Sequence, residues 1–396
     1  MREVDVVVLG AGIGGSVAAG LMSREGYRVA IISQDAGTKN HLPESWDYKP
    51  LHRITNLGSG EKILSTLKKQ SHCCFCSADG RRSVEMTVTD VQNKIEIGDL
   101  VQVDRNQFDR VLLESALEAG AKFFPMSTLE RCEISSSGVA TCISKGGELH
   151  EFTSSFIIDA TGKRAFLSNH LKLPTREETL DTRVACFSHF ETPASKVDGI
   201  RIVAIEGGYL FCIPISDQKL SVGCVLAERL VDLSASPEKI FGFAISLSPY
   251  VTELLAGAKR VLPVIPAKNT QKICLEPAGP RYRLVGDAAA FLDPFFCPGI
   301  DFALFSAEQA ALTIEEDSAL GYQRAIMDWL EESKRSVYQK MENSEWGAIM
   351  RLFADPHLPF TLPLMLTQAF TQIVGAEIPL NVGIKAARRA YDLSSY

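Results

Sequence analysis

The stretch that decides the fold is Gly10-Ala-Gly-Ile-Gly-Gly15, near the start of the chain. An apolar run, Val6-Val-Val-Leu9, precedes it and Ser16-Val-Ala-Ala-Gly-Leu-Met22 follows it, which predicts a strand, a tight turn and a helix. Glycines at this spacing permit the turn, let the backbone approach a pyrophosphate and let the helix pack on the strand. Because a helix N-terminus attracts phosphate charge, we expect a dinucleotide site here. Its predicted contacts are Gly10, Gly12, Gly14 and Gly15.

A second glycine-bearing segment runs from Gly286 to Gly299. Residues 281–285 before it predict a short strand, and residues 300–314 after it predict a helix without proline. Asp287, at the strand end, can accept hydrogen bonds from a sugar-like chain such as ribitol, and the helix N-terminus can stabilise charge on a reduced isoalloxazine ring. The alternative is an ordinary strand, turn and helix with a capping aspartate. Together the two segments indicate FAD, with predicted contacts here at Asp287, Pro294, Gly299 and Ile300.

Four motifs, in this order along the chain, resemble those of the FAD-dependent monooxygenases of the glutathione-reductase-like fold. They are Gly10-x-Gly-x-x-Gly15, Asp104-Arg105-Asn-Gln-Phe108-Asp109, Ile158-Asp159-Ala-Thr-Gly162 and Gly286-Asp287-Ala-Ala. Within that superfamily, residues 1–350 are most similar to flavin-dependent halogenases, including those that act on phenols or carrier-tethered pyrroles. The resemblance implies that Arg105 contacts the FAD and that Asp287 holds its ribitol side.

The chain departs from the halogenase pattern where cofactor and substrate are recognised. The second predicted strand, Tyr27–Ile32, should end in an acidic residue that grips the adenosine ribose, but position 33 is Ser and the nearest acid is Asp35. Ser33 and Asp35 are the predicted contacts there, and we expect weaker FAD binding. The Trp-x-Trp-x-Ile-Pro signature of halogenases is replaced by Tyr209-Leu-Phe211-Cys-Ile213-Pro214. Its two aromatic residues are catalytic candidates, because their bulk can separate flavin from substrate.

The resemblance also implies a lysine that captures or positions hypohalous acid. The segment Leu67-Lys68-Lys69-Gln70-Ser71 matches the family only after a shift of one residue, and Lys69 is the candidate. The alternative is a solvated lysine on an amphipathic helix over residues 60–70.

The predicted flavin loop differs from the family at the halide site as well. Halogenases bind halide at a Ser/Thr-Gly backbone turn, where this chain has Cys297-Pro298-Gly299. Proline lacks a backbone N–H. If the missing donor held the anion, halide binding would weaken, and hydroxylation or dehydrogenation would gain ground. Pro294, in the same loop, completes the catalytic candidates.

The composition is that of a large enzyme. The chain has 396 residues, of which 46% are hydrophobic, enough to bury two intertwined lobes. The net charge of -7, without a basic stripe, predicts no nucleic-acid partner. The chain does not open with a signal-peptide pattern, and its ten cysteines lack regular spacing, so we expect reduced thiols and a cytoplasmic protein.

The run His72-Cys73-Cys74-Phe-Cys76 raises the alternative of a zinc site. Tetrahedral sites usually take Cys-x2-4-Cys pairs from two separate turns, and the sequence has no second pair. The run alternates like a strand, which favours packing of small apolar thiols in a core. We therefore expect no metal site.

These patterns predict an α/β (α+β) fold in which a Rossmann-like FAD-binding domain is interleaved with a mixed or antiparallel-sheet substrate domain, followed by a helical C-terminal segment. The expected FAD-binding pieces are residues 1–50, 98–180 and 270–320. The expected substrate domain consists of residues 51–97 and 181–269, and the C-terminal region of residues 321–396. Alternation at 201–205, 208–214 and 219–225 predicts antiparallel strands.

The C-terminal region contains an apolar stretch from Phe360 to Gly375. Prolines at 359, 363 and 379 interrupt it, so it is too broken for a membrane-spanning helix. One interpretation is a helix packed over the substrate lobe. The other is a patch that contacts a membrane surface or a docking partner, such as a carrier protein that presents a tethered substrate.

The predicted function is an FAD-dependent oxidoreductase of secondary metabolism. It would use reduced FAD and O2 to halogenate or hydroxylate an electron-rich aromatic small molecule, free or tethered to a carrier protein. The middle of the chain has no second Gly-x-Gly-x-x-Gly fingerprint, so electrons would come from a separate flavin reductase or from transient nicotinamide contact. The alternatives are an FAD-dependent reductase or dehydrogenase like the geranylgeranyl reductases, and a non-catalytic scaffold with the flavoprotein fold.

Overall fold

The strand, turn and helix expected around Gly10 are present. The computed structural model describes residues 2–37, 44–47, 52–55, 60–69, 72–81, 83–87, 100–179, 183–192, 197–267, 270–291, 298–314 and 318–343. The four apolar residues of β2 (Val6–Leu9) are almost completely buried, as in a parallel strand covered on both faces. Helix α1 (Ile13–Arg24) begins directly after the glycine turn.

The chain divides into two units that interleave in sequence. Unit 1 contains residues 1–68, 101–180 and 270–331, and unit 2 contains residues 69–100, 181–269 and 332–396. Residues 51–68 fall in unit 1, although the sequence analysis assigned them to the substrate domain. The functional labels of the two domains stay a prediction, because the way a chain clusters in space does not identify a function.

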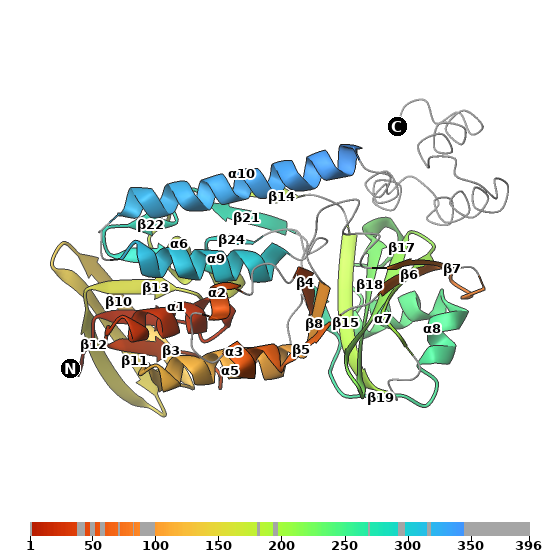
Figure 1. Cartoon of the computed structure of the whole chain (residues 1–396), viewed down its shortest axis with the longest axis horizontal. Helices are drawn as coiled ribbons and strands as arrows, with labels where there is room; N and C mark the ends of the chain where they lie inside the picture. Colours follow the sequence, from red (N-terminus) through yellow and green to blue (C-terminus); the bar gives the residue numbers. More distant parts are fainter. Residues whose placement is uncertain are drawn as a thin grey trace. The chain divides into compact units, whose positions relative to one another are not determined.

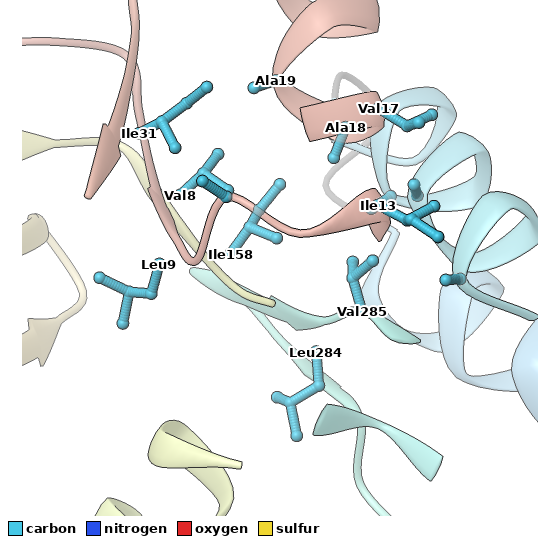
Figure 2. Packing of buried hydrophobic residues seen from close by; sticks show 14 of the residues in the cluster. Val8, Leu9, Ile13, Val17, Ala18, Ala19, Ile31, Ile158, Leu284 and Val285 are labelled. Atoms are coloured by element: carbon cyan, nitrogen blue, oxygen red, sulfur yellow. The ribbon is translucent and has the colours of Figure 1, made fainter. Parts of the chain in front are cut away.

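Unit 1 is built on a six-stranded sheet with the order β22-β23-β13-β2-β3-β9. The strands are β22 (Ala278–Gly279), β23 (Tyr282–Leu284), β13 (Phe156–Asp159), β2, β3 (Val29–Ile32) and β9 (Lys122–Phe124). All neighbours run parallel except β22 and β23. Figure 2 shows how Val8, Ile31 and Ile158 from three of these strands fill the core. The parallel strands bring their carboxyl ends to one edge, where ligands of such sheets bind.

Three helices of unit 1 pack around this sheet. Helix α1 contacts both α5 (Arg105–Glu118) and α9 (Pro298–Leu312) (Figure 1). Helix α10 (Ala319–Asn343) follows, and its Tyr322 hydroxyl donates to the backbone oxygen of Leu284 in β23. The helix expected over residues 300–314 is therefore confirmed, with a start two residues earlier at Pro298. Proline is favoured at a first helical position because its N–H would lack a partner there anyway.

Smaller sheets complete unit 1 and the chain segments around it. One has the order β1 (Arg2–Glu3), β12 (Glu148–Ser154), β11 (Gly138–Lys145) and β10 (Ser127–Ser135). A second has the order β14 (Thr175–Thr179), β21 (Thr270–Cys274) and β24 (Ala290–Phe291). A third consists of β4 (Ser45–Asp47), β8 (Leu100–Val103) and β5 (Leu67–Lys69).

The amphipathic helix considered for residues 60–70 is wrong beyond Leu64. Helix α3 spans Gly60–Leu64 only, and β5 follows. The hydroxyls of Ser65 and Thr66 donate to the backbone oxygens of Lys62 and Ile63, so side chains take up carbonyls near the end of the helix. Lys69 consequently lies at the end of a strand.

Unit 2 is built on an eight-stranded, mostly antiparallel sheet. Its order is β19 (Lys259–Arg260), β15 (Arg183–Glu191), β18 (Lys219–Ala227), β17 (Gly208–Ser216), β16 (Ile200–Ile205), β6 (His72–Cys76) and β7 (Ser83–Thr87), with β20 (Ile265–Ala267) also paired to β15. Strands β16 and β6 run parallel. The strands expected at 201–205, 208–214 and 219–225 are confirmed, and so is the strand expected at the cysteine run.

Two helices cover one face of this sheet, α7 (Pro237–Ser246) and α8 (Pro249–Leu254) (Figure 1). Each starts with Ser-Pro: the hydroxyls of Ser236 and Ser248 accept hydrogen bonds from the first turns, and the prolines need no partner there. The expected fold class, a Rossmann-like sheet interleaved with an antiparallel one, is confirmed.

The cysteines that the structure describes are buried free thiols. Within the described residues, no three His, Cys, Asp or Glu side chains are placed to hold a metal ion. No helix in the part of the chain that is described is both long and apolar enough to cross a bilayer. The apolar stretch from Phe360 to Gly375 lies outside the described residues.

Candidate cofactor site

The glycines of the first motif differ in what they face. A Cβ at Gly10 would lie 2.3 Å from the backbone oxygen of Ala160, and a Cβ at Gly15 would lie 2.0 Å from that of Gly10. A Cβ at Gly14 would lie 2.7 Å from Cγ1 of Val285. Close packing therefore requires these three glycines.

Gly12 is the exception. A Cβ there would meet no atom of the described chain within 4 Å. Gly12 caps α1 without a side-chain hydrogen bond, so the first N–H groups of the helix are not capped by a side chain. Bare backbone at a helix N-terminus suits a diphosphate, which the positive end of the helix dipole attracts. The geometry of Gly12 therefore fits the pyrophosphate of FAD.

The two glycine segments that lie far apart in sequence meet in space. Val285, at the end of β23, contacts Gly14 of α1. The N–H of Gly286 donates to the hydroxyl of Ser306 in α9 at 2.9 Å, and α9 itself packs against α1. The carboxyl ends of β2 and β23 and the middle of α9 thus belong to one region of unit 1, as the FAD interpretation requires.

Asp287 lies in the helical turn Gly286–Ala288, which packs against the turn Gly162–Arg164 after β13. Burial raises the pKa of the Asp287 carboxyl, while the positive charges of Lys163 and Arg105 act to lower it. The Lys163 ammonium also lies 3.8 Å from the ring centroid of Phe291. The carboxyl oxygens of Asp287 can accept hydrogen bonds from cofactor hydroxyls.

Arg105 begins α5 and is almost completely buried. Its Nε and Nη2 donate to the two carboxylate oxygens of Asp109 at 2.9 and 3.0 Å. Burial alone would lower the pKa of Arg105, but the negative charges of Asp109, Glu44 and Asp287 outweigh it and raise that pKa. The guanidinium is therefore a fixed positive charge, held in one orientation by a bidentate partner.

The end of β3 lies at the same edge, because the N–H of Gly10 donates to the backbone oxygen of Ile32 at 2.7 Å. The Ser33 hydroxyl and the Gly37 N–H both donate to Oδ1 of Asp35 at 2.9 Å. Asp35 therefore holds its own loop in shape. Its contact with the adenosine ribose, and that of Ser33, stay predictions.

Asp159 of the third motif stabilises the turn that follows β13. Its carboxylate is completely buried and accepts from the N–H and hydroxyl of Thr161 at 2.9 and 2.6 Å and from the N–H of Leu167 at 2.6 Å. Burial raises the pKa of Asp159, and these hydrogen bonds oppose the rise. The carboxylate shapes the turn that places Ala160 against Gly10 and carries Lys163.

Sequence reasoning missed Lys163 and Gln102. Gln102 of β8 is completely buried, and neither atom of its side-chain amide bonds to any described residue. It stands three positions before Arg105, between the buried Val101 and Val103. A polar residue inside an apolar strand was the available signal, because buried amides normally have partners. This orphan amide is a second feature that fits a bound polar group.

The remaining candidates are placed as follows. Gly299 and Ile300 lie in the first turn of α9, and the Ile300 side chain is part of the core, which leaves only its backbone to face a cofactor. Pro294 lies outside the described residues. Lys69, Tyr209 and Phe211 belong to unit 2, and their catalytic roles stay predictions.

Comparison with known proteins agrees with this geometry. Residues 3–228, more than half of the chain, match the model of a family described as FAD binding domain. A tryptophan 2-halogenase of Chondromyces crocatus is 27% identical over 324 residues, which cover 79% of this chain and 61% of the relative. The chain therefore spans less than two thirds of that relative's length.

One further relative and one solved structure extend the comparison. A 1H-pyrrole-2-carbonyl-(peptidyl-carrier protein) chlorinase of Pseudomonas fluorescens is 26% identical over 342 residues, covering 80% of this chain and 76% of the relative. The solved structure of the myxobacterial chondrochloren halogenase CndH superimposes with a TM-score of 0.72 at 22% identity, covering 95% of this chain and 90% of that one. The structural likeness shows a shared fold.

Proposed function

We propose, since this chain belongs to the FAD binding domain family and takes FAD as its cofactor, that it halogenates an electron-rich aromatic compound with reduced FAD, O2 and halide. The observation that carries the proposal is the bare helix N-terminus at Gly12 on the same sheet edge as Asp287. Both similar relatives named above are halogenating enzymes, which supports this reaction over simple reduction.

The residues of unit 1 would each serve the bound cofactor in a definite way. FAD, when bound, supplies the oxidation chemistry with O2. The first turn of α1 would bind the diphosphate through N–H groups, and Asp287 would accept hydrogen bonds from hydroxyl groups. Lys163 and Arg105 oppose the rise that burial causes in the pKa of Asp287, and they add positive charge, which favours an anionic cofactor. Asp159 fixes the turn that presents Lys163.

Hydroxylation is the second candidate, and one observation favours it. Helix α9 starts at Pro298, which has no N–H to offer an anion at the position where halogenases use Ser or Thr. A weaker halide site would leave oxygen transfer as the outcome of the same oxidation.

Three finer points belong to this proposal. The substrate is either free or tethered to a carrier protein, and the similarity to a chlorinase of carrier-bound pyrrole supports the tethered form. A separate flavin reductase supplies electrons, because only one dinucleotide fingerprint is found in the sequence. The enzyme works in the cytoplasm, where buried thiols such as Cys212 and Cys224 stay reduced.

The test is product analysis with purified protein. The protein is incubated with FAD, a flavin reductase, NADH, O2, a set of phenols and pyrroles, and chloride or bromide. Mass spectra should show halogen isotope patterns in the product. Hydroxylated product in their place would favour the second candidate. A protein that gains no thermal stability from FAD and consumes no O2 would contradict both.

A further inference from the structure

The sheet of unit 2 has two faces that differ in what covers them. Val222, Cys224 and Leu226 of β18 belong to the core cluster formed with α7 and α8. Successive side chains of a strand point to opposite faces. Ser221 and Gly223 therefore lie on the face away from these helices.

Two phenylalanines flank a glycine on that second face. Gly223 is paired in register with Phe211 of β17 and with Phe187 of β15, and paired residues share a face. A Cβ at Gly223 would lie 2.0 Å from Cζ of Phe211, so this ring rests on bare backbone. In the described part of the chain, neither phenylalanine is a member of the two core clusters. The rings therefore belong to an apolar layer outside these two clusters, in which Phe187 is buried and Phe211 is partly exposed.

Polar groups lie at the next position of the same face. His189 of β15 is paired with Ser221, and the ring centroids of His189 and Phe187 are 5.9 Å apart. Ser221 and His189 are 0% and 2% exposed, whereas Phe211 and Tyr209 on the neighbouring strand are partly exposed. Phe187 is also only 2% exposed, so the accessible part of this face is the edge formed by Tyr209 and Phe211 of β17.

The Ser221 hydroxyl differs from that of Ser188 in its hydrogen bonding. It is completely buried and has no hydrogen-bond partner among the described residues. Ser188 of β15 is equally buried, but it belongs to the opposite face and donates to the backbone oxygen of Leu262 at 2.6 Å. Burying a hydroxyl without a partner costs free energy, and native proteins rarely do it. Other buried hydroxyls of described residues, such as that of Thr141, lack a partner too, so what distinguishes Ser221 is its place beside the two phenylalanines.

We propose that this aromatic face, defined by Phe187, His189, Phe211, Ser221 and Gly223, binds the aromatic ring of the substrate, with Ser221 bonded to a phenolic hydroxyl or ring N–H. The inference rests on the proposed function, which requires an electron-rich aromatic compound. The two phenylalanines contact the planar ring, and the bare backbone of Gly223 lets Phe211 lie flat beneath it.

The chemistry of halogenation explains why one serine suits this task. An electrophilic halogen attacks rings that a hydroxyl or ring nitrogen has made electron-rich. The serine oxygen accepts a hydrogen bond from either group. Ser221 therefore recognises the group that makes the ring reactive, and a ring without it would leave the serine unpaired.

The first test separates ligand binding from folding with two serine variants. We expect Ser221→Ala to keep or raise the melting temperature, because the hydroxyl lacks a partner in the ligand-free chain. Ser188→Ala should lower it by about 3 °C, because it breaks a buried hydrogen bond. An equal loss of thermal stability in both variants would overturn the proposal.

The second test measures binding by NMR saturation transfer, with oxidised FAD and without turnover. The probes are phenol and pyrrole, each compared with toluene. In the unaltered protein, phenol or pyrrole should bind more tightly than toluene, and Ser221→Ala should weaken that binding about fivefold to tenfold without changing toluene. Failure of all three probes to bind, or unchanged discrimination in the variant, would overturn the proposal.

The third test displaces the ring of Phe211 by a substitution at Gly223. Gly223→Ala should displace the Phe211 ring and weaken phenol and toluene alike, since it alters the ring contact and leaves the hydroxyl in place. Unchanged binding of both probes would contradict the aromatic face. Because none of these measurements needs O2 or halide, they stand apart from the test of the reaction. Discrimination by Ser221 without any halogenated product would retain the aromatic face and reject the proposed reaction.

Discussion

The cofactor edge of unit 1 and the aromatic face of unit 2 are built from different materials. The cofactor edge offers backbone at Gly12 and charged side chains held by partners, such as Arg105 by Asp109. The aromatic face offers rings on neighbouring strands and one orphan hydroxyl, that of Ser221. The difference teaches that a site made of turns and helix ends leaves glycines in the sequence, whereas a site made by strand register leaves no local signature.

We expect the largest effect from breaking the buried ion pair that distinguishes the cofactor edge. Asp109→Ala leaves the buried guanidinium of Arg105 without its bidentate partner and should lower the free energy of unfolding by about 3–5 kcal/mol. Urea denaturation of FAD-free protein measures it. The matched control is Glu114→Ala in the same helix, whose exposed pairs with Lys62 and Arg110 should each contribute at most about 1 kcal/mol. Equal losses of stability in the two variants would show that burial does not determine how much an ion pair contributes to the free energy of unfolding.

The next prediction tests close packing in the glycine turn. Gly15→Ala puts a Cβ 2.0 Å from the backbone oxygen of Gly10, so the turn must shift. We expect the free energy of unfolding of FAD-free protein to fall by about 3 kcal/mol, at the upper end for overpacking. A fold as stable as the original by chemical denaturation would mean that the turn relaxes freely.

Gly12→Ala sharpens the same contrast, because its Cβ would meet no described atom of the protein. The free energy of unfolding without FAD should change by less than about 0.5 kcal/mol. FAD affinity, followed by flavin fluorescence quenching, should fall at least about tenfold, equal to about 1.4 kcal/mol, because the methyl group blocks approach of the diphosphate. Loss of stability with intact FAD binding would reverse the roles we assign to Gly12 and Gly15.

Asp287→Asn tests whether the buried carboxyl group at the cofactor edge lowers the stability of the FAD-free protein. Burial raises the pKa of Asp287 above its ordinary value of 3.8, so the folded state favours the protonated carboxyl and loses stability as pH rises above 3.8. The variant removes that loss. FAD-free protein should therefore be more stable than the original at pH 7, and the difference should vanish below pH 3.8. FAD affinity should fall about tenfold, since a hydrogen bond to a charged acceptor is lost. A variant less stable at pH 7 would contradict the sign.

The smallest expected effect comes from Lys163→Gln. Lys163 is exposed, so its charge is screened by solvent, and FAD affinity should fall only about threefold at low salt. The loss should disappear in 0.5 M salt, on the order of five times the ionic strength at which the screening length is about 10 Å. A loss independent of salt would point to the contact with Phe291 and away from the charge.

Much of the cofactor edge was predictable because its parts are local. The Gly10–Gly15 turn and the Gly286-Asp287 turn each depend on a few consecutive residues, and their motifs predicted them. The helix considered around Lys69 failed for the same kind of reason, since the hydroxyls of Ser65 and Thr66 are local signals for its end that were overlooked.

Other parts depended on distant residues. Lys163 acquires its place only because the turn after β13 packs against the turn after β23. Gln102 becomes notable only when its burial is known, and a sequence does not state which polar residues are buried. The sequence did not show that Ser221 and Phe187 share a face, because this depends on the register between β15 and β18, which pairs Ser221 with His189 and Phe187 with Gly223.

The sequence by itself determined that unit 1 presents a strand, a bare glycine turn and a helix to a dinucleotide, because steric freedom and helix polarity are properties of neighbouring residues. It also determined the antiparallel strands of unit 2, through alternation of apolar residues. Only the tertiary structure decided which strands pair, and hence that two phenylalanines, a histidine and an unpaired serine share one face. Strand order and register follow from the packing of the whole chain, which no short stretch encodes.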